Sequence, residues 1–475
     1  MADKKKKFYI TTSIPYTNAL PHIGFALEII QADVIARYYR LLGFDVFFLT
    51  GTDEHGQKTL KAAEFLGKDP KVYADEISQK FKDLKQLLNL SNDDFIRTTD
   101  EKRHLPSVYK LWERYKENGD IYKKKYKGFY CSGCEAFKTK KELLGNKCSI
   151  HQKEVEMVEE ENYFFKLSKY LPEVKKNIKS GSIKIIPETK KNEILNMIEQ
   201  GPEDISFLRL KDKYWGWPVP GDETQAFYVW QDALPNYISA IGYDENSGEF
   251  KKYWPADVHF IGKDIVKFHA IFWPAMLLSA GLPLPKSIFI HGFITVNGQK
   301  MSKSLGNVID PFELVKKYGT DAVRYYLLRE IPAAEDGDFT YEKFTQRYNA
   351  DLAGGLGNLL ARVLGIAQNL KIKKSKATKK TEEKIKRIKR NYESALKNFK
   401  FNEALASIWD LISYCDKYIN EEKLWETKNQ GAISDLFYAL HNTAEFLNPF
   451  LPETSEKIRQ ALKAKERTAL FPKID

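Results

Sequence analysis

Long uncharged apolar segments and cysteines are both scarce in this chain. The longest uncharged apolar stretch, Ala270–Pro285, has 16 residues and contains three prolines, so it is too short and too interrupted to span a bilayer. The basic start, Lys4–Lys7, is not followed by the apolar run that a secretory signal requires. Four cysteines cannot cross-link 475 residues into a disulfide framework. We therefore expect a cytoplasmic chain that does not enter a membrane.

Two common phosphate-binding sequences are also absent. The chain contains neither the glycine fingerprint of dinucleotide-binding folds nor the Gly-Lys-Ser/Thr of a P-loop. If the chain binds nucleotide phosphates, it must do so through another motif.

Composition favours several packed domains. Hydrophobic residues make up 43% of the 475 residues, which is enough for more than one core and excludes wholesale disorder. The formal net charge is +11, but the segment Lys371–Lys400 holds thirteen Lys or Arg and three acidic residues, so the rest of the chain is almost neutral. Such a run is usually a solvated helix or linker. A nucleic-acid partner must therefore be inferred from other features.

Strand and helix patterns predict a multi-domain α/β protein. Phe8–Ile14 and Val46–Thr50 are buried-strand patterns on either side of an amphipathic run, His22–Leu42, which together form the opening unit of a doubly wound sheet. Buried-strand patterns return at Ala226–Val229, His259–Ile261 and Ser287–Ile290, and an apolar helix is predicted at Ile265–Leu278. Helical periodicity dominates after residue 349, which predicts a helical bundle.

The predicted organisation is a sheet domain that is split by an insertion and followed by the bundle. Lysine clusters and charged helical stretches without long buried strands mark the insertion. The expected boundaries are 1–116 for the first half of the sheet domain, 117–215 for the insertion, 216–290 for the second half, 291–348 for a loop region and 349–475 for the all-α bundle.

Three of the four cysteines have the spacing of metal ligands. Two residues separate Cys131 from Cys134, and two separate Cys148 from His151. Thiolates and imidazole are the ligands that tetrahedral zinc takes, and four of them predict one closed, structural Zn²⁺ site per chain. Cys415 lies on a helical pattern and is expected to be buried.

Two polar loops lie on either side of the predicted insertion. His22 and Gly24 begin the first helix, where unpaired N–H groups and the helix dipole favour an anion. Lys300–Ser304 places two lysines and two hydroxyls between Gly298 and Gly306, which suits the neutralisation of a triphosphate while pyrophosphate leaves. Each loop taken alone is more often an ordinary surface feature.

Taken together and in this order, the two loops resemble the H-I-G-H and K-M-S-K-S signatures of class I aminoacyl-tRNA synthetases. More narrowly, the chain is similar to methionyl-tRNA synthetases over nearly its whole length, and its cysteine knuckle resembles that of a bacterial subtype with a single Cys3His zinc site. The matching stretches are Ser13–Asn18, Gly51–Gly56, Trp215–Pro220, Tyr228–Ala233, Gly262–Ile265 and Phe268–Pro274. The resemblance implies a Rossmann-like catalytic domain at 1–116 and 216–290, stem contacts at 291–348 and a helical anticodon-binding domain at 349–475.

The resemblance also implies the residues of each site. A methionine pocket would be formed by Ile14, Tyr16, Asp53, Val229, Trp230, Ala233, Leu234, Tyr237, Ile265, Phe268, His269 and Trp273. ATP would be bound by His22, Gly24, Phe25, Gly262, Asp264, Ile294, Lys300 and Lys303, of which His22, Lys300 and Lys303 would be catalytic. The anticodon would be read by Asn358, Arg362 and Trp425.

The reaction and partners follow from the same resemblance. Methionine and ATP would form methionyl-adenylate, with Mg²⁺ and the loop lysines offsetting charge on the departing pyrophosphate. The methionyl group would then pass to tRNA(Met), including the initiator tRNA, for use in translation. We expect a monomer, because no dimerising domain follows the bundle. Phe25 stands where histidine is usual and offers no hydrogen bond, which predicts slower adenylate formation.

Other proteins share parts of this pattern. Cysteinyl-tRNA synthetases have similar signatures but carry a zinc-binding cysteine just before the first one, and no cysteine precedes His22 here. A nucleotidyltransferase that is not a synthetase would have no use for the helical domain. A synthetase relative that only binds tRNA is favoured by Phe25 and opposed by the intact Lys300 and Lys303.

Overall fold

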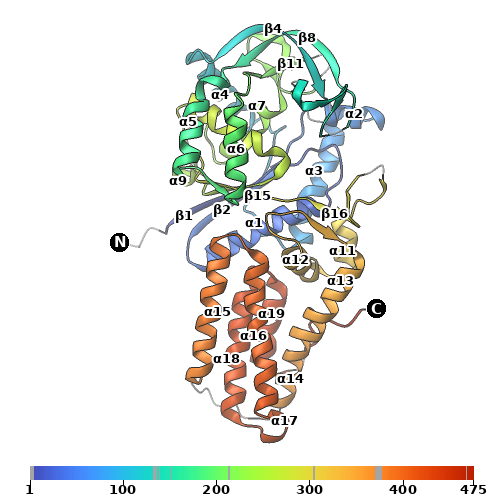
Figure 1. Cartoon of the computed structure of the whole chain (residues 1–475), viewed down its shortest axis with the longest axis vertical. Helices are drawn as coiled ribbons and strands as arrows, with labels where there is room; N and C mark the ends of the chain where they lie inside the picture. Colours follow the sequence, from blue (N-terminus) through green and yellow to red (C-terminus); the bar gives the residue numbers. More distant parts are fainter. Residues whose placement is uncertain are drawn as a thin grey trace. The chain divides into compact units, whose positions relative to one another are not determined.

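The computed structural model describes residues 5–131, 136–138, 140–150, 152–211, 214–302, 305–368, 370, 377–466 and 468–474. The chain divides into two compact units, each of which is drawn from separate segments (Figure 1). The first unit comprises Met1–Pro21, Gly43–Lys85 and Asn92–Ile290, and the second comprises His22–Leu42, Gln86–Ser91 and His291–Asp475. The predicted opening β–α–β segment therefore contributes its strands to the first unit and its helix, α1 (Ile23–Leu41), to the second.

A six-stranded sheet forms the core of the first unit. Its strand order is β3–β2–β1–β14–β15–β9. The strands are β1 (Lys7–Thr12), β2 (Asp45–Thr52), β3 (Asp94–Arg97), β9 (Lys184–Ile186), β14 (Val258–Gly262) and β15 (Ser287–His291). The central β1 runs parallel to both β2 and β14, with Ile10 opposite Phe48 and Val258. Nearly every residue of β1, β14 and β15 is buried, as expected for parallel strands covered on both faces, and the predicted Rossmann-like sheet is confirmed.

One predicted strand is wrong in its extent and its partner. Ala226 and Phe227 end β13 (Asp222–Phe227), which pairs antiparallel with β11 (Leu208–Leu210) and β12 (Pro218–Val219) in a separate small sheet. Val229 begins helix α7 (Val229–Ala233). A short apolar run does not distinguish a buried strand from a buried helical turn, which is why the sequence pattern misplaced this segment.

The lysine-rich region contains two long strands that the sequence did not predict. β4 (Ile121–Cys131) and β8 (Glu156–Phe165) pair antiparallel, and their register places lysines opposite glutamates. Lys127 and Glu159 form one such ion pair, with 2.9 Å between nitrogen and oxygen. Cross-strand charge pairs stabilise a sheet that faces water. These strands therefore need few apolar residues, and no apolar pattern marks them in the sequence.

Helices and short strands complete the region around the main sheet. The helices are α2 (Gln57–Phe65), α3 (Pro70–Leu87), α4 (Leu105–Glu117), α5 (Leu167–Ser180), α6 (Thr189–Glu199), α8 (Asn236–Ser239), α9 (Gly248–Tyr253) and α10 (Trp273–Ser279). The short strands are β5 (Ala136–Lys138), β6 (Leu143–Leu144), β7 (Lys147–Cys148) and β10 (Ile205–Ser206). Helices α5 and α6 lie side by side, and both contact the π-helical segment η4 (Phe268–Phe272) (Figure 1).

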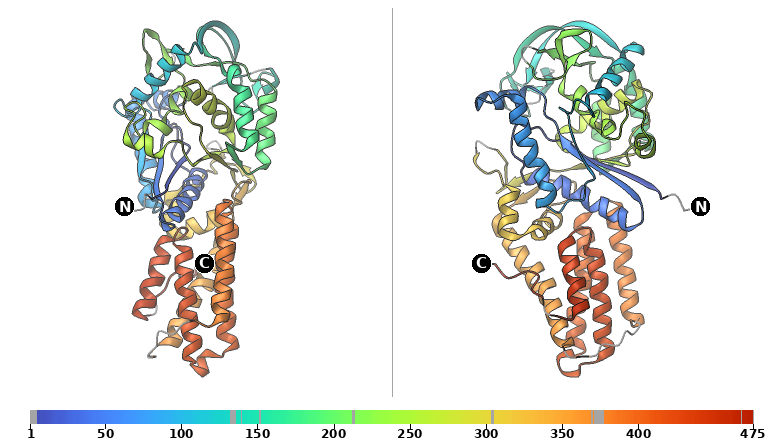
Figure 2. Two further views of the ribbon diagram at one scale, coloured as in Figure 1. Left: turned by 90° about the vertical axis from the view of Figure 1, so that its left-hand side faces the viewer. Right: turned by 180° about the vertical axis from the view of Figure 1, so that it is seen from behind.

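The second unit combines a small sheet with a helical bundle. The sheet contains β16 (Ile294–Val296), β17 (Gln299–Lys300) and β18 (Gly337–Phe339). After β18, every element in the described part of the chain is helical. The helices are α11 (Pro311–Tyr318), α12 (Thr320–Arg329), α13 (Tyr341–Arg347), η6 (Tyr348–Gly357), α14 (Asn358–Ala367), α15 (Lys379–Lys397), α16 (Phe401–Glu421), α17 (Leu424–Thr427), α18 (Gln430–Leu447) and α19 (Pro452–Ala464). Figure 2 shows the long helices of the bundle running side by side, which confirms the predicted helical domain.

A buried arginine joins several segments of the second unit. The Arg324 guanidinium, which is fully buried on α12, lies 2.8 Å from the Asp33 carboxylate on α1. It also donates to the carbonyls of Leu88, Pro449 and Phe450. Since an unpaired buried charge is costly, this arginine requires all of these acceptors to be present together.

One helical run in the second unit is unusually apolar. Tyr341–Ala367 is long and apolar enough, by length and composition alone, to cross a membrane, with a mean hydropathy of 1.2. The core helix of a soluble protein passes the same test. Its α14 part packs against α16 and α18 of the bundle.

Candidate active site

Aromatic side chains from three segments meet at the carboxyl end of the main sheet in the first unit. Trp230 of α7 stacks on Phe268 of η4, with the ring centroids 3.6 Å apart and the planes 7° from parallel. Tyr16, in the loop after β1, meets the edge of Trp230 at 6.5 Å. These rings line a surface that suits a polarizable thioether, since sulfur contacts with aromatic rings are favourable. The structure therefore brings together residues that the sequence placed in one methionine pocket.

A tyrosine and a histidine provide a polar pair within these aromatic walls. The His269 Nε2 atom lies 2.7 Å from the Tyr237 hydroxyl, and His269 Nδ1 lies 3.0 Å from the Ile265 carbonyl. Burial lowers the pKa of His269 to about 4, so the ring is neutral at pH 7. The carbonyl can only accept, so Nδ1 carries the proton and Nε2 accepts from the Tyr237 hydroxyl. Both protons of the pair are thus donated within the protein, and the orientation of each group is fixed.

Asp53 follows the end of β2 and is almost fully buried. Its backbone N–H donates to the Pro15 carbonyl at 2.9 Å, and its carbonyl accepts from Thr17 N–H at 3.0 Å. A parallel bridge between Tyr16 and Asp53 thus extends the β1–β2 pairing beyond both strands. A carboxylate held in this way suits an α-ammonium group, the role that the sequence predicted for Asp53.

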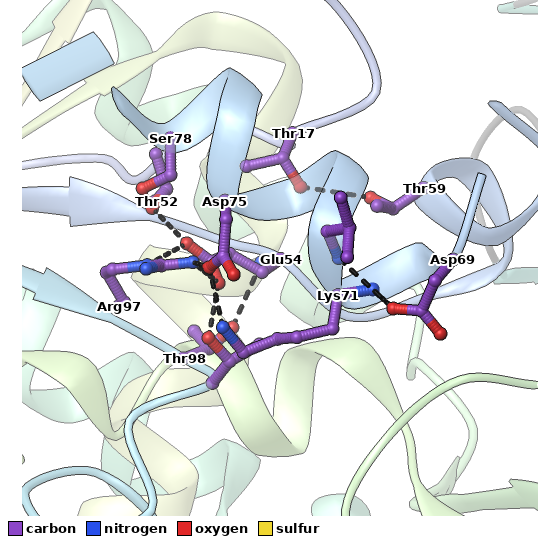
Figure 3. A network of polar contacts seen from close by, with 12 residues as sticks. Thr17, Thr52, Glu54, Thr59, Asp69, Lys71, Asp75, Ser78, Arg97 and Thr98 are labelled. Atoms are coloured by element: carbon purple, nitrogen blue, oxygen red, sulfur yellow. Dashed lines mark hydrogen bonds and ion pairs between the residues drawn. The ribbon is translucent and has the colours of Figure 1, made fainter. Parts of the chain in front are cut away.

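The neighbouring Glu54 is held by a dense polar network, which Figure 3 shows. Its carboxylate, which is completely buried, accepts from Arg97 Nε at 2.6 Å and from Arg97 Nη2 at 2.8 Å. The hydroxyls of Thr52 and Thr99 donate to the same carboxylate. The Thr98 hydroxyl accepts from the Glu54 backbone N–H at 3.0 Å. The segment that carries Asp53 is therefore fixed by both its backbone and its neighbour's side chain.

The other predicted pocket residues lie on the same segments of the first unit or on the adjoining α10. Val229, Ala233 and Leu234 belong to α7 or directly follow it, and all three are buried. Trp273 begins α10, is completely buried and lies 6.1 Å from the Tyr237 ring. Ile14 lies in the loop after β1.

The first signature lies at the beginning of α1 in the second unit. His22 is the N-cap residue, and its Nδ1 atom accepts from the Gly24 backbone N–H at 3.0 Å. The neutral ring therefore carries its proton on Nε2 and can donate it to an anion. A Cβ atom at Gly24 would lie 2.8 Å from the His22 ring, so a larger residue would displace the cap. Phe25, next in the signature, is half-buried on α1 and contributes no polar side-chain atom.

Within this unit, a described residue of the second signature lies close to the first: a Cβ atom at Gly24 would be 3.6 Å from Met301 Cε. The Ile23 N–H donates to the Ile309 carbonyl at 3.1 Å, which ties the end of the signature loop to the start of α1. Lys300 is exposed on β17, and Ile294 is buried on β16. Lys303 lies outside the described residues. The other two predicted ATP residues, Gly262 and Asp264, belong to the first unit, at and just after the carboxyl end of β14.

Sequence reasoning missed two polar contacts of the second unit near these signatures. Asn307 accepts from Ser302 N–H at 2.8 Å and donates to the Lys300 carbonyl at 3.2 Å, which braces the loop. The ring of His291 lies 2.7 Å from both the Glu28 carboxylate and the Gly292 carbonyl. Asn307 follows the recognised signature directly, whereas nothing in the sequence pairs Glu28 with His291.

The three predicted anticodon residues lie on the helical bundle. Arg362 of α14 donates to Asp416 and Asn420 of α16, both at 2.9 Å, and Asn358 is exposed one helical turn earlier. Trp425 is 50% exposed on the single turn of α17. Left-handed residues at both ends of that turn, Lys423 and Lys428, separate it from the long helices and leave the indole available for stacking.

Two of the four predicted zinc ligands can be placed. Cys131 ends β4 and Cys148 ends β7, and both are completely buried. Cys134 and His151 lie outside the described residues. Among the residues that are described, no cluster of three or more His, Cys, Asp or Glu forms a metal site.

The geometry of both units agrees with the families whose sequences match the chain. A family described as tRNA synthetases class I (M) matches residues 8–146 and 138–364. An anticodon-binding domain of tRNA ligases matches residues 377–475. The methionine–tRNA ligase of Thermotoga maritima is 46% identical and covers 97% of this chain and 76% of its own length. That of a Nostoc species is 43% identical, covering 96% of this chain and 90% of its own.

Solved structures agree with these sequence matches. Mycobacterium tuberculosis methionyl-tRNA synthetase in complex with methionyl-adenylate superimposes with a TM-score of 0.90 at 38% identity, covering 96% of this chain and 93% of that one. The free form of the same enzyme superimposes with a TM-score of 0.85 at 33% identity, covering 100% of this chain and 99% of that one. The chain described here therefore belongs to the methionine family of class I tRNA synthetases.

Proposed function

We propose that this chain attaches methionine to its tRNA in an ATP-dependent reaction that passes through methionyl-adenylate. The observation that carries this proposal is the buried Tyr237–His269 pair among stacked aromatic rings, in a chain that matches methionine–tRNA ligases over 97% of its length. A neutral polar pair beside aromatic walls accommodates a thioether without offering a charged partner to a more polar side chain.

The reaction needs no covalent enzyme nucleophile. The methionine carboxylate attacks the α-phosphorus of ATP and pyrophosphate leaves. The terminal ribose hydroxyl of the tRNA then attacks the adenylate carbonyl, the bond to the phosphate breaks and AMP leaves. Asp53 would hold the ammonium group, and Asp264 would accept from the ribose hydroxyls of ATP. The negative charge of the phosphate groups would be offset by the His22 Nε2–H, the N-terminus of α1, Lys300 and Lys303. Mg²⁺, bound with ATP, would supply further positive charge.

Other parts of the proposal concern partners and metal content. We propose that tRNA(Met), including the initiator, binds through Asn358, Arg362 and Trp425, and that the chain acts in the cytoplasm as a monomer. We also propose one structural Zn²⁺ on Cys131, Cys134, Cys148 and His151. The donor set supports the metal, because thiolates and imidazole are the ligands that structural zinc takes. Two of the four donors, Cys131 and Cys148, are fully buried thiols at the ends of strands.

Methionine-dependent exchange between ATP and pyrophosphate tests the proposed activity. We expect exchange with methionine and none with cysteine, because no zinc-binding thiol precedes His22. With Phe25→His, we expect faster adenylate formation and an unchanged KM for methionine, since one added donor is typically worth about 10² to 10³ in rate. Absence of methionine-dependent exchange in both proteins, with the fold intact, would favour a relative that only binds tRNA.

Metal analysis tests the zinc proposal. Purified protein should contain about one equivalent of zinc, and Cys131→Ser or Cys148→Ser should lose it. The matched control is Cys415→Ser, which removes a buried thiol of α16 and should leave the metal content unchanged. Full zinc content in both ligand variants would contradict the assignment.

Substitution of Trp425 tests the role of the bundle. Trp425→Ala should raise the KM for tRNA by about 5- to 150-fold, because a stacked base contributes about 1–3 kcal/mol. ATP–pyrophosphate exchange, which needs no tRNA, should be unaffected. Tyr438→Ala, which removes another exposed aromatic of the same domain, is the control and should change neither assay. Equal losses in both assays for Trp425→Ala would assign it a structural role instead.

A further inference from the structure

A buried cluster of two histidines and one aspartate lies beside the aromatic residues of the proposed methionine pocket in the first unit. The Asp232 carboxylate on α7 lies 2.7 Å from His55 Nδ1 and 3.1 Å from His104 Nε2. All three side chains are at most 3% exposed. The family resemblance assigns none of them a role.

The hydrogen bonds fix how each member of the cluster is oriented. His104 Nε2 also lies 2.9 Å from the Asp232 carbonyl, so this nitrogen donates both to the backbone carbonyl and to the Oδ1 atom of Asp232. His104 Nδ1 lies 2.9 Å from the Ser239 hydroxyl, which can donate to it. His55 donates to the second carboxylate oxygen through Nδ1. Burial alone would raise the pKa of Asp232, but the two histidines hold that pKa below its ordinary value, so the carboxylate stays charged.

The cluster connects the two sides of the pocket. His55 lies two residues after Asp53, on the segment that the β1–β2 pairing and the Glu54 network hold rigid. Asp232 lies between Trp230 and Ala233 on the five-residue helix α7. The 2.7 Å bond between His55 and Asp232 is therefore a direct link from the carboxylate side of the pocket to its aromatic wall.

Two tryptophans surround the His55 ring and limit its movement. The ring centroids of Trp215 and Trp217 lie 4.8 Å and 5.0 Å from that of His55, both edge-on. Trp217 Nε1 donates to the Thr98 carbonyl at 2.8 Å, and the Trp215 carbonyl accepts from Gly56 N–H. His55 thus transmits the position of Asp232 to the backbone next to Asp53.

We propose that Asp232 is a positioning residue that, through His55 and His104, sets the distance between the Asp53 carboxylate and the Trp230 wall, and thereby the affinity for methionine. The inference rests on the proposed function of the pocket. It assigns no contact between the cluster and the substrate. The residues proposed to bind ATP do not take part in the hydrogen bonds of the cluster. Loss of the cluster should therefore change the KM for methionine more than the KM for ATP or kcat.

Substitutions at position 55 separate hydrogen bonding from packing. Asparagine places its side-chain nitrogen where Nδ1 of histidine lies, so His55→Asn retains a donor to Asp232, whereas glutamine places its nitrogen one bond farther and loses it. Glutamine, however, fills more of the space between the two tryptophans. A packing role therefore predicts that His55→Gln is the better tolerated variant, and the positioning role predicts the reverse.

The test measures steady-state ATP–pyrophosphate exchange with full-length protein. We expect His55→Gln and Asp232→Asn to raise the KM for methionine by about 10- to 100-fold, as for the loss of a hydrogen bond to a charged group, with His55→Asn close to wild type. The same two substitutions at His441, an exposed histidine of the bundle, are the control. His441→Asn and His441→Gln should both have the wild-type KM for methionine.

Two results would overturn the inference. One is a KM for methionine in His55→Gln that equals or falls below that of His55→Asn, and the other is a parallel loss of kcat and ATP affinity in Asp232→Asn. Should position 55 not tolerate substitution, His104→Gln retains the donor to Asp232 and His104→Asn loses it, and equal methionine KM values for that pair would also overturn the inference. Failure of the proposed function would be distinct, because wild-type protein would then show no methionine-dependent exchange.

Discussion

Buried carboxylates with fully formed hydrogen bonds are the constraint on which the first unit's pocket depends. Glu54 and Asp232 lie on opposite sides of it, and both are almost inaccessible to water. Removing a carboxylate from water costs several kcal/mol unless donors replace the lost solvent, so each of these groups requires Arg97 or the two histidines in one geometry. The requirement fixes the backbone on both sides and leaves Asp53 and Trp230 in defined places.

The signature segments of the second unit are held differently, mainly by hydrogen bonds of backbone N–H and carbonyl groups. His22 caps α1 by accepting from the Gly24 N–H through Nδ1. The Ile23–Ile309 hydrogen bond ties the segment after the second signature to the same helix end, and the Asn307 amide bonds to the backbone of Lys300 and Ser302. In the proposed function, a helix N-terminus and two lysines would bind the phosphate groups, so neither of the two common phosphate motifs would be needed.

The sequence predicted those parts of the fold that depend on local pattern. Strands β1, β2, β14 and β15 each contain an apolar run that marks a buried strand, and the long helices carry amphipathic periodicity. The two signatures identify the family. β4 and β8 were missed because a solvent-facing ladder of lysine and glutamate lacks the apolar alternation by which strands are recognised. The contact between His55 and Asp232 joins residues 177 positions apart, and no spacing rule predicts a pair formed only by tertiary structure.

Calorimetric titration of methionine in the absence of ATP tests most directly whether the rigidly held Asp53 binds the ammonium group of methionine. Asp53→Asn should weaken binding by roughly 10- to 150-fold, as expected for the loss of a charge-assisted hydrogen bond worth about 1.5–3 kcal/mol. Asp264→Asn, which alters an exposed carboxylate placed at the ATP ribose, should bind methionine as wild type does. Unchanged methionine affinity in Asp53→Asn would contradict the account.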